Sequence, residues 1–153
     1  MVETANETPR QSSLYETDFH AWTQQQATRL RAGDVAGLDL AHLAEEVEDM
    51  GRRERRELES RLTVLLSHLL KWQYQAGLRS RSWSATIREQ RRQVQRHLDR
   101  NPSLKACLDE LYLVAYEEAR FVAGLETGYT EVAFPAACPY RIEDALDAAF
   151  WPD

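Results

Sequence analysis

The histidine and glutamate side chains are the residues best suited to bind a metal ion, and three of them share one helical face. His42, Glu45 and Glu46 are spaced so that a helix places them side by side. Di-metal sites in helical bundles are built from inward Glu and His side chains, usually as two Glu-x-x-His motifs. This chain has the reversed order, once, and His20, His42 and His97 lie among polar residues typical of an exposed surface. We therefore expect surface or capping histidines, with no bound metal and no cofactor.

His68 differs from the other histidines because it lies in an apolar run. Leucines flank it on both sides over residues 65–70, so we expect its imidazole to be partly buried. A buried imidazole needs a hydrogen-bond partner, which Glu45, Glu46 or Tyr116 could supply across a bundle. A core histidine with a satisfied hydrogen bond is the ordinary interpretation, and a general base is the sharper one.

The candidate polar site therefore combines His68 with three charged residues: Glu45, Glu46, His68 and Lys71. We assign no catalytic residue, because the sequence has no glycine-rich phosphate loop and no nucleophile motif. The enzymatic alternative is a metal-dependent or hydrolytic enzyme centred on Glu46 and His68.

A basic stripe recurs every four residues on one predicted helix. With a neighbouring arginine and a tryptophan, it makes up the candidate binding face: Arg88, Arg91, Arg92, Arg96 and Trp83. Cationic and stacking groups together suit nucleic acid. The same arginines can instead pair with the acidic run over residues 45–49, which is the interpretation we favour. The formal net charge of −6 also argues against a dedicated nucleic-acid-binding protein.

Charge is sorted along the chain. Residues 52–101 carry a net charge of +8, whereas residues 1–51 and 102–153 each carry −7. This pattern suits a chain that folds back and neutralises itself, or one that presents a basic face to an acidic partner.

Length and composition are those of a globular domain. We expect a disordered tail over residues 1–13 and a single helical domain over residues 14–153 of the 153-residue chain. No apolar run approaches the length that spans a bilayer, and the first residues lack the hydrophobic stretch of a secretory signal, so a cytoplasmic location is expected. Cys107 and Cys138 are too few and too far apart for a disulfide framework or a cysteine zinc site.

Apolar residues recur with the helical period in five segments and predict an all-α fold, an antiparallel bundle of four to five main helices plus a short C-terminal helix. The predicted segments are residues 18–31, 40–75, 83–100, 102–126 and 142–150. Their predicted caps are Thr17 for the first, Asp39 for the second, and Ser82 or Ser84 for the third. The second segment is either one long helix or two helices broken at Gly51. Residues 129–141 are expected to form an ordered loop.

The apolar stripes predict which side chains face the core. On the first segment these are Phe19, Trp22 and Leu30. On the second, they follow one phase from Leu40, Leu43, Val47 and Met50 to Leu58, Leu62, Leu65, Leu66 and Leu69. The third and fourth segments contribute Trp83, Ile87, Val94, Leu98, Leu104, Leu108, Leu111, Ala115, Ala119 and Val122.

Short motifs in a fixed order carry a resemblance to a bacterial family, the domain of unknown function 29. They are Leu14-Tyr15-Glu16-Thr17-Asp18, Trp22, Leu38-Asp39, Glu45-Glu46, His68-Leu69-Leu70-Lys71-Trp72, Ser82-Trp83, Thr86, Arg91, Pro102-Ser103-Leu104, Cys138-Pro139-Tyr140 and Phe150-Trp151-Pro152. The resemblance extends from Tyr15 to Pro152. It implies a bacterial, cytoplasmic, all-α protein, and it implies no reaction, cofactor or substrate.

The sequence therefore favours a protein that acts by binding an unidentified protein partner and is not an enzyme. A nucleic-acid-binding module that uses the arginines of residues 79–100 is the alternative, and the enzyme centred on Glu46 and His68 is the second alternative. We expect no membrane association, and a homodimer is possible.

Overall fold

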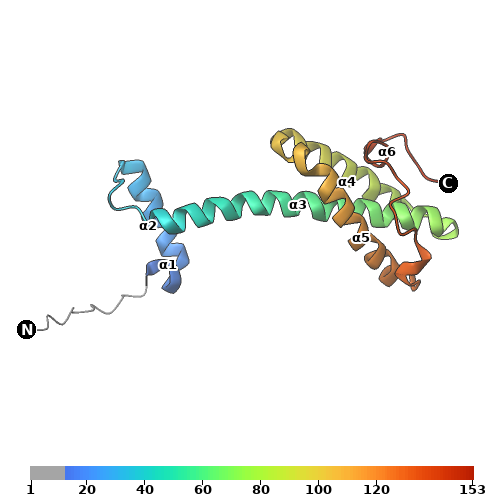
Figure 1. Cartoon of the computed structure of the whole chain (residues 1–153), viewed down its shortest axis with the longest axis horizontal. Coiled ribbons are helices and arrows are strands. Elements are labelled where there is room, and N and C mark those ends of the chain that lie inside the picture. The colour runs from blue at the N-terminus through green and yellow to red at the C-terminus, as the bar shows by residue number, and fades with distance from the viewer. Residues whose placement is uncertain (1–12) are drawn as a thin grey trace, which may run out of the picture. The chain divides into compact units, whose positions relative to one another are not determined.

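The computed structural model describes residues 13–153, and every regular element within that range is a helix (Figure 1). The predicted all-α fold is therefore confirmed. Residues 1–12, which make up most of the predicted disordered tail, lie outside the described range. Packing divides the chain into a first unit that ends at Met50 and a second unit that begins at Gly51, and each is described by itself. That residues 14–153 form a single domain stays a prediction.

The first unit consists of two short elements and the beginning of a long one: α1 (Leu14–Thr17), α2 (Phe19–Ala32) and α3 (Leu40–Tyr74). Asp18 caps α2, because its Oδ1 accepts a hydrogen bond from the Ala21 N–H at 2.9 Å. The predicted cap, Thr17, is wrong: it is the last residue of α1, and its hydroxyl donates to the Ser13 carbonyl. Gly33 ends α2, two residues past the predicted segment, in the left-handed conformation that glycine adopts without strain.

A small core of aromatic and polar side chains holds the first unit together. Trp22 and Gln26 are the buried residues of α2. The Trp22 indole N–H donates to Asp39 Oδ2 at 3.1 Å, and the Asp39 backbone N–H donates to Gln26 Oε1 at 2.8 Å. Asp39 thus joins α2 to the start of α3. Phe19 and Leu30 were expected to face inward but are about half exposed, because α2 buries only the narrow strip that carries Trp22 and Gln26.

The long helix α3 is continuous through Gly51, so the single-helix alternative of the sequence analysis is the observed one. It ends at Tyr74, next to the predicted end at Gln75. The remainder of α3 belongs to the second unit, together with η1 (Ala76–Leu78), α4 (Arg81–Arg100), η2 (Pro102–Cys107), α5 (Leu108–Thr127), η3 (Glu131–Ala133) and α6 (Ile142–Leu146).

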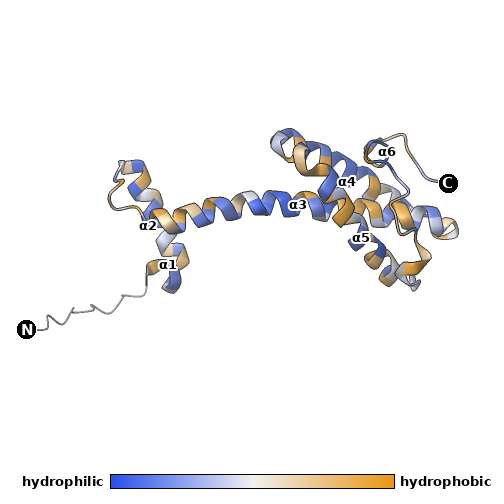
Figure 2. Ribbon diagram, viewed as in Figure 1, coloured by the Kyte–Doolittle hydropathy of each residue, from blue (hydrophilic) through white to orange (hydrophobic). Residues whose placement is uncertain are grey.

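The core of the second unit lies where its part of α3 meets α4 and α5. Figure 2 shows hydrophobic and hydrophilic residues recurring along each of these helices, as expected for helices with one apolar face. The predicted core residues of these three helices include the following buried ones: Leu58, Leu62, Leu65, Leu66, Leu69, Ile87, Val94, Leu98, Leu111, Ala115 and Ala119.

Helix boundaries in the second unit differ from the predicted ones. Ser80 caps α4 by accepting the Trp83 N–H, in place of Ser82 or Ser84. Pro102 does begin a helical turn, but residues 102–107 form a 3₁₀ helix and α5 starts only at Leu108. The final helix also ends earlier than predicted, at Leu146. None of the helices in the described range is long and apolar enough to cross a membrane.

The segment after α5 is an ordered loop, as predicted, and it is anchored to the core. Phe134 and Tyr140 are buried, and the Tyr140 hydroxyl donates to Gln73 Oε1 at 2.8 Å. Near the C-terminus, the Trp151 ring packs on the Trp72 ring of α3 at 4.8 Å between centroids. The C-terminal segment is therefore part of the folded second unit.

Candidate functional site

The glutamates of the candidate polar site belong to the first unit, where Glu46 binds a tyrosine. The Tyr15 hydroxyl donates to Glu46 Oε1 at 2.7 Å, and this hydrogen bond is the main reason that the pKa of Tyr15 rises to about 12. The Tyr15 ring also stacks on the imidazole of His42 at 3.9 Å. His42 in turn contacts Asp39 Oδ2 at 2.6 Å, which raises the pKa of His42. Glu45 is exposed.

His68 and Lys71 belong to the second unit and have their own partners there. His68 Nδ1 donates to the Val64 carbonyl of the same helix at 2.8 Å, and burial lowers the pKa of this imidazole. Lys71 is buried, and its Nζ lies 2.5 Å from Glu126 Oε2 of α5 and 5.1 Å from the centre of the Trp83 ring of α4. Lys71 thereby ties α3 to α4 and α5.

The four candidate residues therefore belong to two different units, Glu45 and Glu46 to the first and His68 and Lys71 to the second. Glu46 accepts the hydrogen bond from Tyr15 within the first unit. Within the second unit His68 bonds to its own helix, and the Tyr116 hydroxyl donates to the Pro135 carbonyl instead. A partly buried histidine bonded to a carbonyl is what the ordinary interpretation of His68 expects.

The candidate binding face is split by burial. Arg88, Arg92 and Arg96 are exposed on α4, and Arg92 pairs with Glu89 of the same helix at 2.8 Å. Arg91 is buried and unavailable to a ligand.

Arg91 holds the C-terminal segment in place. Its Nε donates to the Ala145 carbonyl at 2.8 Å, its Nη2 donates to the Phe150 carbonyl at 2.7 Å, and its guanidinium lies 5.3 Å from the centre of the Trp151 ring. Burial lowers its pKa. The spacing of Arg91 from Ile87 already placed it on the apolar stripe of α4, and this signal distinguishes it from the other arginines.

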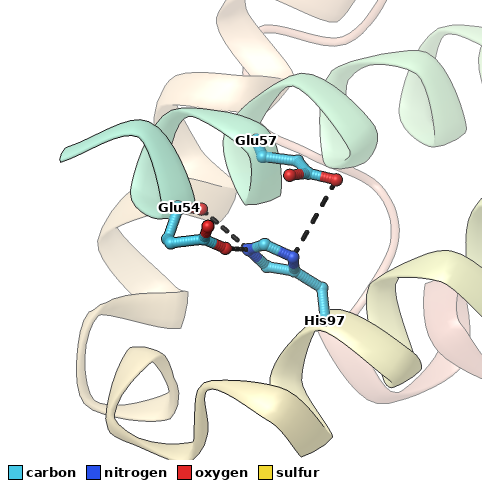
Figure 3. A group of neighbouring side chains, drawn as sticks. All are labelled: Glu54, Glu57 and His97. Atoms are coloured by element: carbon cyan, nitrogen blue, oxygen red, sulfur yellow. Dashed lines mark hydrogen bonds and ion pairs between the residues drawn. The ribbon is translucent and has the colours of Figure 1, made fainter. Parts of the chain in front are cut away.

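A second histidine cluster joins α3 to α4 (Figure 3). His97, expected to be exposed, is buried; its Nε2 donates to the Glu54 carbonyl at 2.8 Å, and its Nδ1 lies 4.0 Å from Glu57 Oε1. Glu54, Glu57 and His97 each offer a ligand atom within 4.8 Å of the others, the only such group found in residues 13–153. However, Arg61 donates twice to Glu57 Oε1, at 3.0 and 2.8 Å, and lowers its pKa. We assign the cluster to helix packing, because this carboxylate is already neutralised.

A cleft of about 510 Å³ lies between α5 and the loop that precedes α6. The Tyr112 hydroxyl on its wall donates to the Tyr140 carbonyl at 2.9 Å, and Cys138 Sγ lies 3.5 Å from the same hydroxyl. Burial raises the pKa of the Cys138 thiol, so this sulfur is protonated at neutral pH and is a poor nucleophile.

An apolar groove of about 550 Å³ lies in the first unit, and we call it the α2–α3 groove. Its lining consists of Leu30, Leu38, Leu40, Leu43, Ala44, Val47 and Glu48. The apolar stripe at the start of α3 was predicted to face the core, and this prediction is wrong for Leu40, Val47 and Met50. Leu40, Val47 and Met50 are 61%, 66% and 60% exposed. α1 meets α3 instead through His42 and Glu46, on another side of the helix.

Comparison with known families gives one decisive match. The family model described as "Domain of unknown function DUF29" matches residues 14–151, nearly the whole chain. The chain belongs to the DUF29 family. No curated protein and no solved structure matches it.

In this DUF29 chain Glu46, Lys71 and Arg91 each join one element to another, and the first unit carries an exposed apolar groove. The sequence missed the groove, since a helical period shows that a face is apolar without showing whether the chain covers it. It also missed Glu126 as the partner of Lys71 and Tyr15 as the partner of Glu46, because these contacts join distant segments.

Proposed function

We propose that this chain acts by binding another protein through the α2–α3 groove. The observation that carries the proposal is the groove itself, a concave surface with six apolar side chains and one carboxylate. Contiguous apolar surface with a polar rim is typical of interaction sites on folded proteins. A groove between helical elements is the surface that a partner helix fills with its apolar side chains.

Burial of the groove would supply a useful binding energy. Covering an exposed leucine or valine contributes about 1.5–3 kcal/mol per side chain, and Leu40 and Val47 are mostly exposed. These contacts act against an association cost of about 4–15 kcal/mol, so the binding depends on several of them being made together.

The polar clusters support the same proposal because each has an evident structural role. Lys71 is neutralised by Glu126, His97 is bonded to Glu54, and Arg91 holds two carbonyls of the C-terminal segment. The arrangement of the Cys138 thiol likewise disfavours nucleophilic catalysis, since burial raises its pKa.

The test is a crosslinking experiment in a bacterial host, with a photocrosslinking residue placed at position 47. We expect a specific crosslinked protein that is lost in a variant carrying Leu40→Asp, which adds a charge to the groove. A matched control, Leu113→Asp, changes an exposed leucine of α5 in the second unit and should retain the crosslink. Identical crosslinks from both variants, or none from the unmodified groove, would overturn the proposal.

A further inference from the structure

We infer that the occupant of the α2–α3 groove is an amphipathic helix with lysine or arginine along one edge of its apolar stripe. The inference rests on the proposed function and names the partner of the same groove. It depends on the dimensions of the groove and on the charge around it.

The wall of the groove matches the repeat of a helix. Leu40, Leu43 and Val47 follow one another at steps of three and four on α3, over about 10 Å of helix axis. A partner helix that contributes three apolar residues at the same steps covers this length in two turns. Leu30 and Leu38 line the groove from the end of α2 and the loop that follows it.

The charge around the groove is negative. Residues 13–50 contain eight carboxylates and two arginines, and Glu48 lines the groove with Glu45 exposed one turn earlier on α3. Of the two arginines, Arg29 donates to the Gly37 carbonyl, which leaves Arg31 as the exposed one. A partner with a basic edge is therefore favoured by electrostatic complementarity, and an acidic partner is opposed by it.

The same charges disfavour a second copy of this chain as the occupant. A second first unit would bring its own eight carboxylates against this surface. The exposed arginines of α3 and α4 in the second unit do not solve the problem, because the apolar residues beside them, such as Leu58 and Ile87, are already buried in that unit. The basic helix must come from another protein.

The experiment uses the full chain and three synthetic helical peptides. The first has an apolar i, i+3, i+7 stripe flanked by lysine, the second has the same stripe flanked by glutamate, and the third is a scrambled form of the first. Binding is followed by fluorescence anisotropy at low and at high salt. We expect the lysine peptide to bind about tenfold more tightly than the glutamate peptide, with a preference that shrinks as salt rises. The scrambled peptide should not bind.

Charge reversal supplies the matched control. The double variant Glu45→Lys and Glu48→Lys should reverse the preference toward the glutamate peptide. The variant Glu117→Lys and Glu118→Lys changes the net charge equally on α5, in the second unit, and should leave the preference unchanged.

The outcomes separate this inference from the proposed function. If both charged peptides bind equally, the inference that the partner helix has a basic edge is overturned, while the groove remains a protein-binding site. A crosslink from position 47 that joins two copies of this chain overturns the foreign helix in favour of a dimer. Failure of every peptide, with the crosslinked partner still captured, shows that the occupant is not such a helix. Failure of both experiments removes both proposals.

Discussion

Lys71 Nζ and Glu126 Oε2 lie 2.5 Å apart, although the two side chains differ widely in their access to water. The lysine side chain is 7% exposed and the glutamate side chain is 48% exposed. The ammonium group therefore depends on this carboxylate and on the face of the Trp83 ring for its stabilisation.

Unequal exposure predicts unequal effects of removing the two partners. Glu126→Gln leaves the buried ammonium without its counter-charge and should lower the free energy of unfolding by about 1–2 kcal/mol, less than in a fully buried pair because water reaches the site. Lys71→Met removes the charge and keeps most of the packing, so we expect a change within about 1 kcal/mol. Urea unfolding of both variants checks this order, and an equal or greater loss in Lys71→Met contradicts it.

Arg91 should prove to be a structural residue, in contrast to its neighbour Arg92. Arg91→Ala removes two hydrogen bonds to carbonyls of the C-terminal segment and should cost about 2–4 kcal/mol of stability. Arg92→Ala breaks an exposed pair within one helix and should leave the unfolding midpoint unchanged. Limited proteolysis near the C-terminus gives a second readout, because only Arg91→Ala should expose that segment. Similar effects of the two substitutions would count against this division of the arginine face.

The apolar spacing of the sequence predicted much of the core that α3, α4 and α5 contribute to the second unit, but not the buried loop residues Phe134 and Tyr140. Leu58, Leu62, Ile87 and Val94 keep the helical period and are fully buried, since each helix has neighbours on its apolar side. Leu40 keeps the same period and is exposed. Periodicity identifies an apolar face, and only the tertiary structure decides whether the chain itself covers that face.

The candidate site was harder to predict, because the chemical type of a side chain does not show whether that side chain is buried. Arg91 and His97 are buried although both are polar, and each donates to carbonyl groups of other segments. The positions of those carbonyls depend on how α6 and α3 pack, and no local pattern encodes them. Because arginine and histidine are polar, Arg91 was predicted to lie on a binding face and His97 on an exposed surface. In the fold they are instead buried hydrogen-bond donors.

His68 should make the stability of the chain depend on pH near neutrality. Burial holds the pKa of this imidazole below its usual value of 6.5, and the neighbouring Lys71 acts in the same direction while Glu126 opposes it. The unfolded chain therefore binds a proton more readily than the folded one. The neutral imidazole of His68 therefore contributes fully to the free energy of unfolding above about pH 6.5. This contribution is lost as the pH falls from there toward the lowered pKa of the folded state.

The measurement for His68 is the free energy of unfolding of the unmodified chain and of His68→Gln from about pH 8 to pH 5. We expect the loss of stability on acidification to be smaller in the variant, which has no imidazole to protonate. A larger loss in His68→Gln would reverse the sign and contradict the buried, neutral imidazole.

Gly51 should be replaceable by alanine with a gain in stability. It lies in helical conformation within α3, and no atom lies within 4 Å of the position that a Cβ would take. Glycine in a helix interior costs about 0.5–1 kcal/mol relative to alanine, because the unfolded chain has more freedom to lose. Gly51→Ala should therefore raise the unfolding midpoint and leave the helical content measured by circular dichroism unchanged or higher.

Gly33→Ala is the matched contrast, since the φ of 70° at Gly33 makes any side chain strained and the same substitution should destabilise the chain. Destabilisation by Gly51→Ala would show that the helix bends at this residue or that another molecule approaches its backbone there.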